Sequence, residues 1–409
     1  MKKSLLILSA FIGLSTILFI SLTARPQYSI LQTYGTKCEN CHYNVQGGGA
    51  RTPQGFLARK DMSIIKPSWL GIASFFDKVT TTNSVLDDKV IFGTDFRYQS
   101  AKFPKVGDKT GANERLNFLM QFSPYLVIKP LSWLELEGFY NLGYDLVKDH
   151  RYVSQSRGSA SVIIKPSEDL PSLRAGYFQP TIGTKYDDHT MYIRKLRIGS
   201  APLFPDDYAE IGAQLDYTAQ KWFDVSVGVF DSKSMSALQV TNKSGKTIPV
   251  VDTGSISAAL RAFVTPEIMK GVSTFFGGTY FVNKDFYISS VFFNIGLPDK
   301  ISLMTEYTRA EKKDAFLSLS FLAELTYQLH ESVLPFVRVE RGVIREKTTK
   351  VAIPAALPYE TPYYQNQYVF GVHINVLPFI DLLPEYRITH WEHYAGYTSQ
   401  LAVQLHVFY

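Results

Sequence analysis

Both cysteines of the chain lie in one five-residue stretch, Cys38-Glu39-Asn40-Cys41-His42. Two thiols three residues apart, with a histidine directly after the second, form the attachment pattern of a c-type haem. The thiols can bond to the two vinyl groups of one porphyrin, and the adjacent imidazole then binds the iron as the proximal ligand. The sequence therefore predicts one covalently bound haem c, held by Cys38 and Cys41, with His42 on the iron.

The Cys-x-x-Cys spacing also occurs in disulfides, in redox dithiols and in zinc sites. A thioredoxin-like dithiol needs a strand-to-helix context, and none is visible around Cys38. A structural zinc site needs about four ligands, but the chain has no second pair of cysteines. The full match through His42 favours haem attachment over these alternatives.

Two residues are candidates for the second axial position on the iron. Met62 lies 20 residues after His42, and Met/His ligation is one arrangement found in cytochromes c. The alternative for Met62 is ordinary packing. His189 follows two aspartates in a long mixed-charge segment, where a histidine is more often simply exposed. Met62 and His189 are therefore alternative candidates for the distal ligand. The sequence assigns no catalytic residue.

The N-terminus has the layout of an export signal. Lys2-Lys3 precede an uncharged apolar run from Leu5 to Leu22, and Ala24 offers a small residue for cleavage. An uncleaved membrane anchor is the alternative, since the run is about long enough to span a bilayer. We interpret residues 1–24 as a removed signal peptide, because c-type haem is attached on the exported side of a bacterial inner membrane. Residues 25–80 then form a monohaem cytochrome c segment, too short to bury much of a core by itself.

The composition is unusual for a soluble protein of 409 residues. Aromatic residues make up 14% and charged residues 19% of the chain, with 25 Tyr and 28 Phe. Aromatics are therefore high and charge is low. The formal net charge of +5 is small for this length, so it gives no argument for nucleic-acid binding.

From about Lys89 onward, apolar and polar residues alternate. Val225, Val227 and Val229, for example, alternate with Asp224 and Ser226. A period of two indicates a strand with one apolar and one polar face. The same alternation occurs at 90–98, 116–123, 134–141, 317–325 and 401–409.

Turn signals separate these runs. Short connections recur at 129–130, 166–171, 218–221, 265–270, 297–300, 329–332 and 377–378, and longer polar segments lie at 99–114, 145–157, 180–207, 232–252 and 344–365. Short turns alternating with long loops are typical of outer-membrane barrels. We therefore predict an all-β fold, a transmembrane outer-membrane β-barrel of roughly 16 antiparallel strands over residues 88–409. A large soluble β-sandwich is the alternative, but it rarely keeps one face this polar over so many strands.

Charged residues recur on the polar side of the predicted strands, which in a barrel faces the lumen. They are Asp95, Arg97, Glu135, Glu137, Glu210, Asp224, Glu306, Glu324, Arg338, Glu340, Glu385 and Arg387. Mixed charge there fits either a generic polar lumen or a chamber that holds a plug. The long segment 177–197 is expected to fold inward and narrow the pore. The last run ends on Tyr409, which resembles the terminal insertion signal of bacterial outer-membrane barrels.

An export signal, one Cys-x-x-Cys-His motif and a barrel to the terminal aromatic together resemble the fused monohaem cytochrome–porins of bacterial outer membranes. The similarity covers the architecture, and its specific part is residues 31–42. That family includes proposed outer-membrane iron oxidases, which take electrons from ferrous iron at the cell surface. The resemblance implies a haem inside or at the mouth of the barrel, in the lumen or the periplasm. Gly47-Gly48-Gly49 departs from the iron-oxidase pattern, which leaves the substrate open.

This resemblance leads to two functional hypotheses. The first is an outer-membrane electron-transfer protein, which relays electrons between an extracellular redox partner such as iron and a periplasmic cytochrome or other soluble carrier. The direction of flow is not encoded. The second is a diffusion porin with an appended periplasmic cytochrome domain. Both require outer-membrane lipid around the barrel, and neither involves nucleic acid.

Overall fold

The computed structural model describes residues 37–57, 62–79, 81–104, 113–146, 158–184, 209–236, 239–241, 244, 246–252, 254–298, 300–346, 363–391 and 397–409. The predicted signal peptide and the candidate ligand His189 lie outside these ranges. No helix in the described part of the chain is long and apolar enough to cross a membrane.

Antiparallel strands dominate the described chain. They are β1 (Ser84–Val85), β2 (Val90–Pro104), β3 (Asn113–Leu131), β4 (Leu134–Tyr140), β5 (Gly158–Ile164), β6 (Ser172–Phe178), β7 (Glu210–Tyr217), β8 (Phe223–Phe230), β9 (Gln239–Thr241), β10 (Thr247–Pro249), β11 (Ser257–Val264), β12 (Ser273–Asn283), β13 (Phe286–Leu297), β14 (Ile301–Lys312), β15 (Phe316–Tyr327), β16 (Val333–Glu346), β17 (Tyr363–Leu377), β18 (Ile380–Trp391) and β19 (Tyr397–Phe408).

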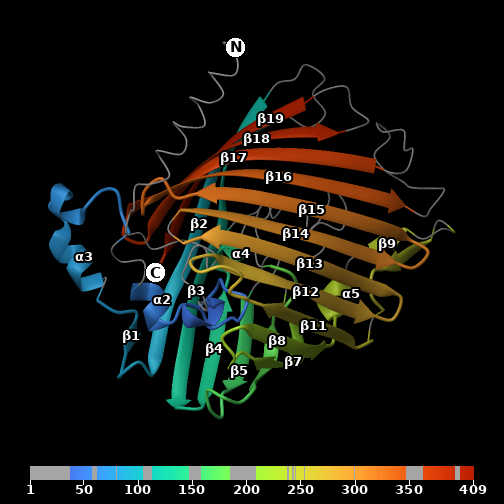
Figure 1. The fold of residues 1–409 in the computed structure, drawn as a ribbon, viewed down its shortest axis with the longest axis horizontal. Helices are drawn as coiled ribbons and strands as arrows, with labels where there is room; N and C mark the ends of the chain where they lie inside the picture. Colours follow the sequence, from blue (N-terminus) through green and yellow to red (C-terminus); the bar gives the residue numbers. More distant parts are fainter. Residues whose placement is uncertain are drawn as a thin grey trace.

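Sixteen of the described strands, β2–β8 and β11–β19, close into one barrel (Figure 1). Each strand pairs with the next along the chain, β8 pairs with β11, and β19 pairs back with β2. The predicted all-β, 16-stranded antiparallel barrel is therefore confirmed. Strands β12–β19 have 11 to 15 residues, and a tilted strand needs about 9–11 to cross a bilayer.

The short helices are not part of the barrel wall. They are η2 (Cys38–Asn40), α2 (Pro53–Leu57), η3 (Pro67–Leu70), α3 (Ala73–Val79), α4 (Leu142–Leu146) and α5 (Lys233–Ser236). The helices η2 and α2 lie near one end of the barrel, and α3 extends away from it (Figure 1). At this end the turns 132–133, 218–222 and 378–379 are tight. We call it the short-turn end, and the opposite rim the long-loop end.

The alternation of each strand places polar side chains inside the barrel and apolar ones outside. In β14, Glu306 is 4% exposed while its neighbour Tyr307 is 41% exposed. The outer face carries a belt of exposed apolar side chains, including Leu126, Leu136, Val162, Leu215, Val227, Val229, Leu260, Phe276, Val291, Phe321, Leu325, Val337, Phe370, Tyr386 and Leu401. The charged residues predicted to face the lumen are buried, apart from the half-buried Asp95. A polar interior and an apolar exterior are the arrangement of a membrane barrel.

One predicted face is wrong in β3. The alternation from Leu116 to Phe122 predicts that all its apolar residues share one side, but a β-bulge shifts the register beside Met120. Arg97 pairs with Gln121, whereas the next residue, Tyr98, pairs with Leu119. One extra residue reverses every side chain beyond it. In the partner strand, residues 99–104, predicted in a loop, belong to β2.

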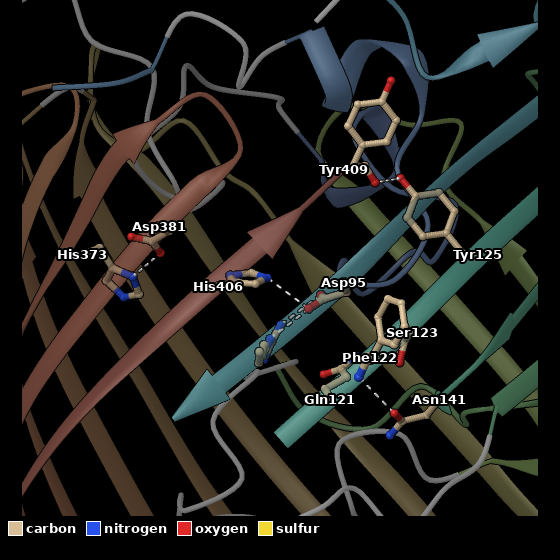
Figure 2. A network of polar contacts seen from close by, with 11 residues as sticks. Asp95, Gln121, Phe122, Ser123, Tyr125, Asn141, His373, Asp381, His406 and Tyr409 are labelled. Atoms are coloured by element: carbon tan, nitrogen blue, oxygen red, sulfur yellow. Dashed lines mark hydrogen bonds and ion pairs between the residues drawn. The ribbon is translucent and has the colours of Figure 1, made fainter. Parts of the chain in front are cut away.

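The barrel closes at the short-turn end through the last residue. The Tyr125 hydroxyl donates a hydrogen bond to the Tyr409 carbonyl oxygen at 2.8 Å (Figure 2). Gly93 lies directly beside this contact, because a Cβ there would come within 1.9 Å of the Tyr409 oxygen. In the same region, His406 and Asp95 are 3.0 Å apart across the β19–β2 seam (Figure 2).

Candidate functional site

Lys37 and the Cys-x-x-Cys-His motif that follows it lie at the short-turn end of the barrel. Lys37, only 7% exposed, forms an ion pair with the inward-facing Asp224 of β8. Its ammonium group also donates to the carbonyl oxygens of Thr218 and Gln220, at 2.6 and 2.5 Å, in the β7–β8 turn. A buried ammonium with a carboxylate and three carbonyl oxygens as acceptors, the third being that of Phe223 at 3.4 Å, is well satisfied. Lys37 therefore fixes the motif to this part of the wall.

The chain then reaches the part of the wall formed by β2 and β3. Tyr43 is buried against Ile91, Tyr125 and Val127, which face inward from β2 and β3. Lys129 lies over its ring at 5.2 Å. Burial raises the pKa of the Tyr43 hydroxyl. The segment thus packs inside the barrel mouth and shares its core with the wall.

The next residues reach the barrel seam. The guanidinium of Arg51 lies 4.7 Å from the ring centre of Phe408. Phe56 stacks on Phe379 of the β17–β18 turn, with ring centres 4.7 Å apart, and meets Tyr409 edge-on. These contacts hold α2 against the C-terminal strands.

Within the motif, a single helical turn brings the key side chains together. The N–H groups of Cys41 and His42 both donate to the Cys38 carbonyl oxygen, at 3.1 and 2.9 Å. Residues i and i+3 eclipse in a 3₁₀ turn, so both thiols lie on one side of η2, and both are partly exposed.

Gly47 lies directly against this turn. A Cβ on Gly47 would lie 3.6 Å from the Cys38 sulfur and 3.8 Å from the His42 ring, and its φ of +81° favours glycine. Glycine is therefore favoured at position 47 by its backbone conformation, and this backbone packs directly against the Cys38 and His42 side chains. Two partly exposed thiols on one turn and an imidazole beside them fit a covalently attached haem c.

Glu39, which lies between the two cysteines, is close to the charged side chains Lys37 and Lys165. Burial raises the pKa of its carboxyl group, while a hydrogen bond with Thr218 and the charges of Lys37 and Lys165 act in the opposite direction. The positive charges of Lys37 and Lys165 therefore partly offset the cost of burying the Glu39 carboxylate.

The segment after β6 folds into the lumen, as predicted from the sequence for the described residues 179–184. Its backbone is held by the wall: Gly183 N–H donates to Thr279 Oγ1 at 3.2 Å, and Thr184 N–H donates to Glu306 Oε2 at 3.0 Å. Thr181 Oγ1 donates to Gln214 Oε1 at 3.0 Å. We call residues 179–184 the inward loop.

The inward loop also touches the motif segment. The Gln46 side-chain amide donates to the carbonyl oxygens of Ile182 and Gly183, at 3.0 and 2.9 Å. The Gly183 oxygen accepts a second hydrogen bond from Arg261 Nε at 3.1 Å. Wall, loop and motif segment thus meet at one carbonyl group.

Beyond the inward loop, apolar side chains fill part of the long-loop half of the lumen. They form one buried cluster, Phe178, Phe230, Val250, Val251, Ala259, Phe281, Phe286, Ile288, Ala310, Ala315 and Phe316. Val250 and Val251 come from the segment after β10, so a connection folds over the strands and covers them. Charged residues therefore line the lumen near the motif, and an apolar cluster lies beyond it.

Of the two candidate distal ligands, only Met62 lies in the described part of the chain. Met62 is 3% exposed, and two residues later Ile64 N–H donates to the Asn375 carbonyl oxygen at 2.9 Å. His189 lies outside the described residues. The role of either as sixth ligand stays a prediction. In the described part of the chain, no group of three or more His, Cys, Asp or Glu side chains is arranged to hold a metal ion.

Sequence reasoning did not single out Lys37, Gln46, Gly183 and Arg261. Arg261 had a usable signal, because it is the one charge in the alternating run 257–264. Gln46 and Gly183 had none, since their contact joins two irregular segments.

The inward-facing histidines belong to local pairs. His373 Nδ1 lies 3.3 Å from Asp381 Oδ2 across β17 and β18 (Figure 2). His406 contacts Asp95, which also binds Arg97. Both are structural pairs of the lumen wall.

No protein-family model matches the chain, and no curated protein sequence matches it significantly. OprB and DcaP are two of the solved structures that share its fold. OprB of Pseudomonas putida is 12% identical, with a TM-score of 0.53, covering 84% of this chain and 97% of OprB. The outer membrane channel DcaP of Acinetobacter baumannii is 9% identical, with a TM-score of 0.51, covering 78% of this chain and 97% of DcaP. The chain is therefore a closed 16-stranded β-barrel with the fold of bacterial outer-membrane porins.

Proposed function

We propose that this protein is an electron-transfer protein of the bacterial outer membrane, carrying one covalent haem c at the short-turn mouth of its barrel. Cys38 and Cys41 hold the group through thioether bonds, and His42 is the proximal ligand. A bound haem c supplies one-electron transfer without a bond to a substrate. The observation that carries the proposal is the placement of the motif inside the barrel mouth, fixed by Lys37 to Asp224.

The protein's own residues give this group a fixed position. Lys37, Tyr43 and Gln46 fasten the motif segment to the β7–β8 turn, to β2 and β3, and to the inward loop. Short turns in outer-membrane barrels face the periplasm, so the motif lies on the side where periplasmic carriers arrive. A buried apolar cluster lies between the motif and the long-loop end, and we expect it to restrict the passage of water.

The thickness of the outer membrane explains why such a relay would be needed. The apolar band around an outer-membrane barrel is about 25 Å tall, which separates a periplasmic carrier from a donor or acceptor outside. A redox group held inside the barrel shortens the gap on each side. The extracellular partner is a redox-active species such as ferrous iron, and the partner on the other side is a periplasmic cytochrome or similar carrier.

Two measurements on purified protein test this proposal. Ferrous iron added at neutral pH is expected to reduce the chromophore, and a periplasmic cytochrome added afterwards is expected to reoxidise it. In planar bilayers the protein is expected to show little conductance. A large open pore together with a chromophore that ferrous iron does not reduce would instead identify a diffusion porin with an appended cytochrome.

A further inference from the structure

Arg261 differs from the other buried arginines of the lumen. Each of the others has a carboxylate within ion-pair distance: Arg97 has Asp95, Arg174 has Glu137, Arg338 has Glu324 and Glu340, and Arg387 has Glu385. Arg261 is 3% exposed. Within the described residues its one hydrogen bond runs from Nε to the Gly183 carbonyl oxygen. Its two terminal amino groups have no acceptor there.

A buried guanidinium without an anion is costly. Desolvation of a charged group is compensated in proteins by pairing and hydrogen bonding. The nearby carboxylates are engaged elsewhere. Asp224 pairs with Lys37, and Glu306 and Asp216 each accept a hydrogen bond from a neighbouring wall side chain. The two terminal amino groups of Arg261 can therefore donate hydrogen bonds to an anion.

Aromatic rings also flank Arg261. Three phenylalanines lie beside its guanidinium carbon, with ring centres at 4.6 Å for Phe263, 5.8 Å for Phe275 and 5.5 Å for Phe292. Phe263 and Phe275 are 4.3 Å apart, and Phe275 and Phe292 are stacked at 5.2 Å. These rings form an aromatic wall inside the barrel, with one cation at its edge.

This wall adjoins the haem motif. Phe263 pairs in register with Asp224, the carboxylate that holds Lys37, the residue before Cys38. Arg261 also lies within electrostatic range of Cys38, so that a negative charge at that position would act on its guanidinium group. An apolar planar group that carries carboxylates, attached at Cys38, would meet the aromatic wall and the cation together.

We infer that Arg261 is a positioning residue that binds a carboxylate of the group attached at Cys38 and Cys41. This inference rests on the proposed function, since it needs the haem and its propionates. Guanidinium groups bind carboxylates by paired hydrogen bonds. The cation would therefore stabilise the negative charge of that carboxylate, and the Phe263, Phe275 and Phe292 rings would supply apolar contacts for the bound group.

The test compares midpoint potentials of the full-length protein and its variants in detergent, by spectroelectrochemical titration at several pH values. Arg261→Gln removes the charge and the paired donors, while Arg261→Lys keeps the charge alone. Arg309→Gln, an exposed arginine on the outer face, is the matched control for net charge. Covalent haem content is measured for every variant.

Arg261→Gln is expected to keep its covalent haem and to favour the ferric form at least tenfold, which is about 59 mV downward for one electron. Its potential becomes more dependent on pH near neutrality, because the carboxylate loses its partner. Arg261→Lys shifts in the same direction by less, and Arg309→Gln does not shift.

An unchanged potential and pH profile in Arg261→Gln, with haem present, overturns the inference and leaves the proposed function standing. If Arg261→Gln does not fold, an unchanged Arg261→Lys has the same consequence. Absence of covalent haem from the unmodified protein overturns the proposed function itself.

Discussion

Gln46 and Gly183 are joined by a hydrogen bond of 2.9 Å, although they lie 137 residues apart. This bond connects the segment that carries the two cysteines to the loop that folds into the barrel. The same Gly183 oxygen accepts from Arg261 of the wall. The position of the motif therefore depends on a loop backbone whose conformation favours glycine.

Gly183→Ala is expected to detach the motif segment. Gly183 has a φ of +62°, and a Cβ there would come within 2.2 Å of Glu306 Oε1. The left-handed conformation alone costs about 1–3 kcal/mol for a residue with a side chain, and the clash adds to it. Limited proteolysis with a broad-specificity protease should cut the variant near residue 46 sooner.

Gly254→Ala is the matched control for that variant. Gly254 has a similar φ of +78°, but a Cβ added there would have nothing within 4 Å. It is expected to lose stability without faster cleavage of the motif segment. Equal cleavage in both variants would mean that strain, and not the junction, governs the effect.

Lys37→Met is expected to weaken the same docking from the other side. The variant leaves Asp224 buried without its cation, since both side chains are only 6% exposed. Removing one partner of a buried pair costs about 3–5 kcal/mol. Urea unfolding followed by tryptophan fluorescence measures the loss. Lys233→Met removes an exposed lysine paired with Asp231 and should change stability by less than about 1 kcal/mol.

The alternation of the strands predicted the barrel and its faces, because a two-residue period follows directly from strand geometry. Asp224 and Arg338, for example, lie on the lumen side as expected. The alternation failed at Met120, where a bulge adds one residue to β3. Such a bulge depends on the partner strand, and its position was not visible in the alternation of β3 alone.

The site was predicted less completely than the fold. The spacing of Cys38, Cys41 and His42 identifies the residues predicted to hold the haem, because attachment to one porphyrin fixes their separation. Their anchors could not be predicted, because Lys37–Asp224 and Gln46–Gly183 are contacts across the lumen between distant segments. Those contacts follow from how the closed barrel positions its loops.

Gly93→Ala is expected to prevent closure of the barrel. A Cβ would come within 1.9 Å of the Tyr409 oxygen and 2.3 Å of the Tyr125 hydroxyl, so the last strand cannot take its place beside β2. The fraction of compact barrel on unheated denaturing gels should fall sharply. Gly138→Ala, with only a 3.6 Å contact, should give a normal compact band. If Gly93→Ala also gives that band, the terminal residue is not needed for closure.

The docking of the motif segment should weaken as the pH rises. Burial raises the pKa of Glu39 above its ordinary value of 4.5, so the docked state binds more protons than the released one. Stability then falls as the pH increases from about 4.5 through the raised value. Proteolysis rates measured from pH 4.5 to 8 should increase for the unmodified protein. Glu39→Gln should make this dependence less steep, and an equally steep profile in that variant would assign it to another group.

Covalent attachment of the haem is the property on which the proposed electron transfer depends. The purified full-length protein is denatured, extracted with acidified organic solvent to remove any loosely bound haem, and assayed as its pyridine haemochrome. We expect one covalently retained haem per chain, lost in Cys38→Ala while the compact barrel band remains. A protein without covalent haem, or a Cys38→Ala variant that keeps its full complement, would contradict the proposed attachment.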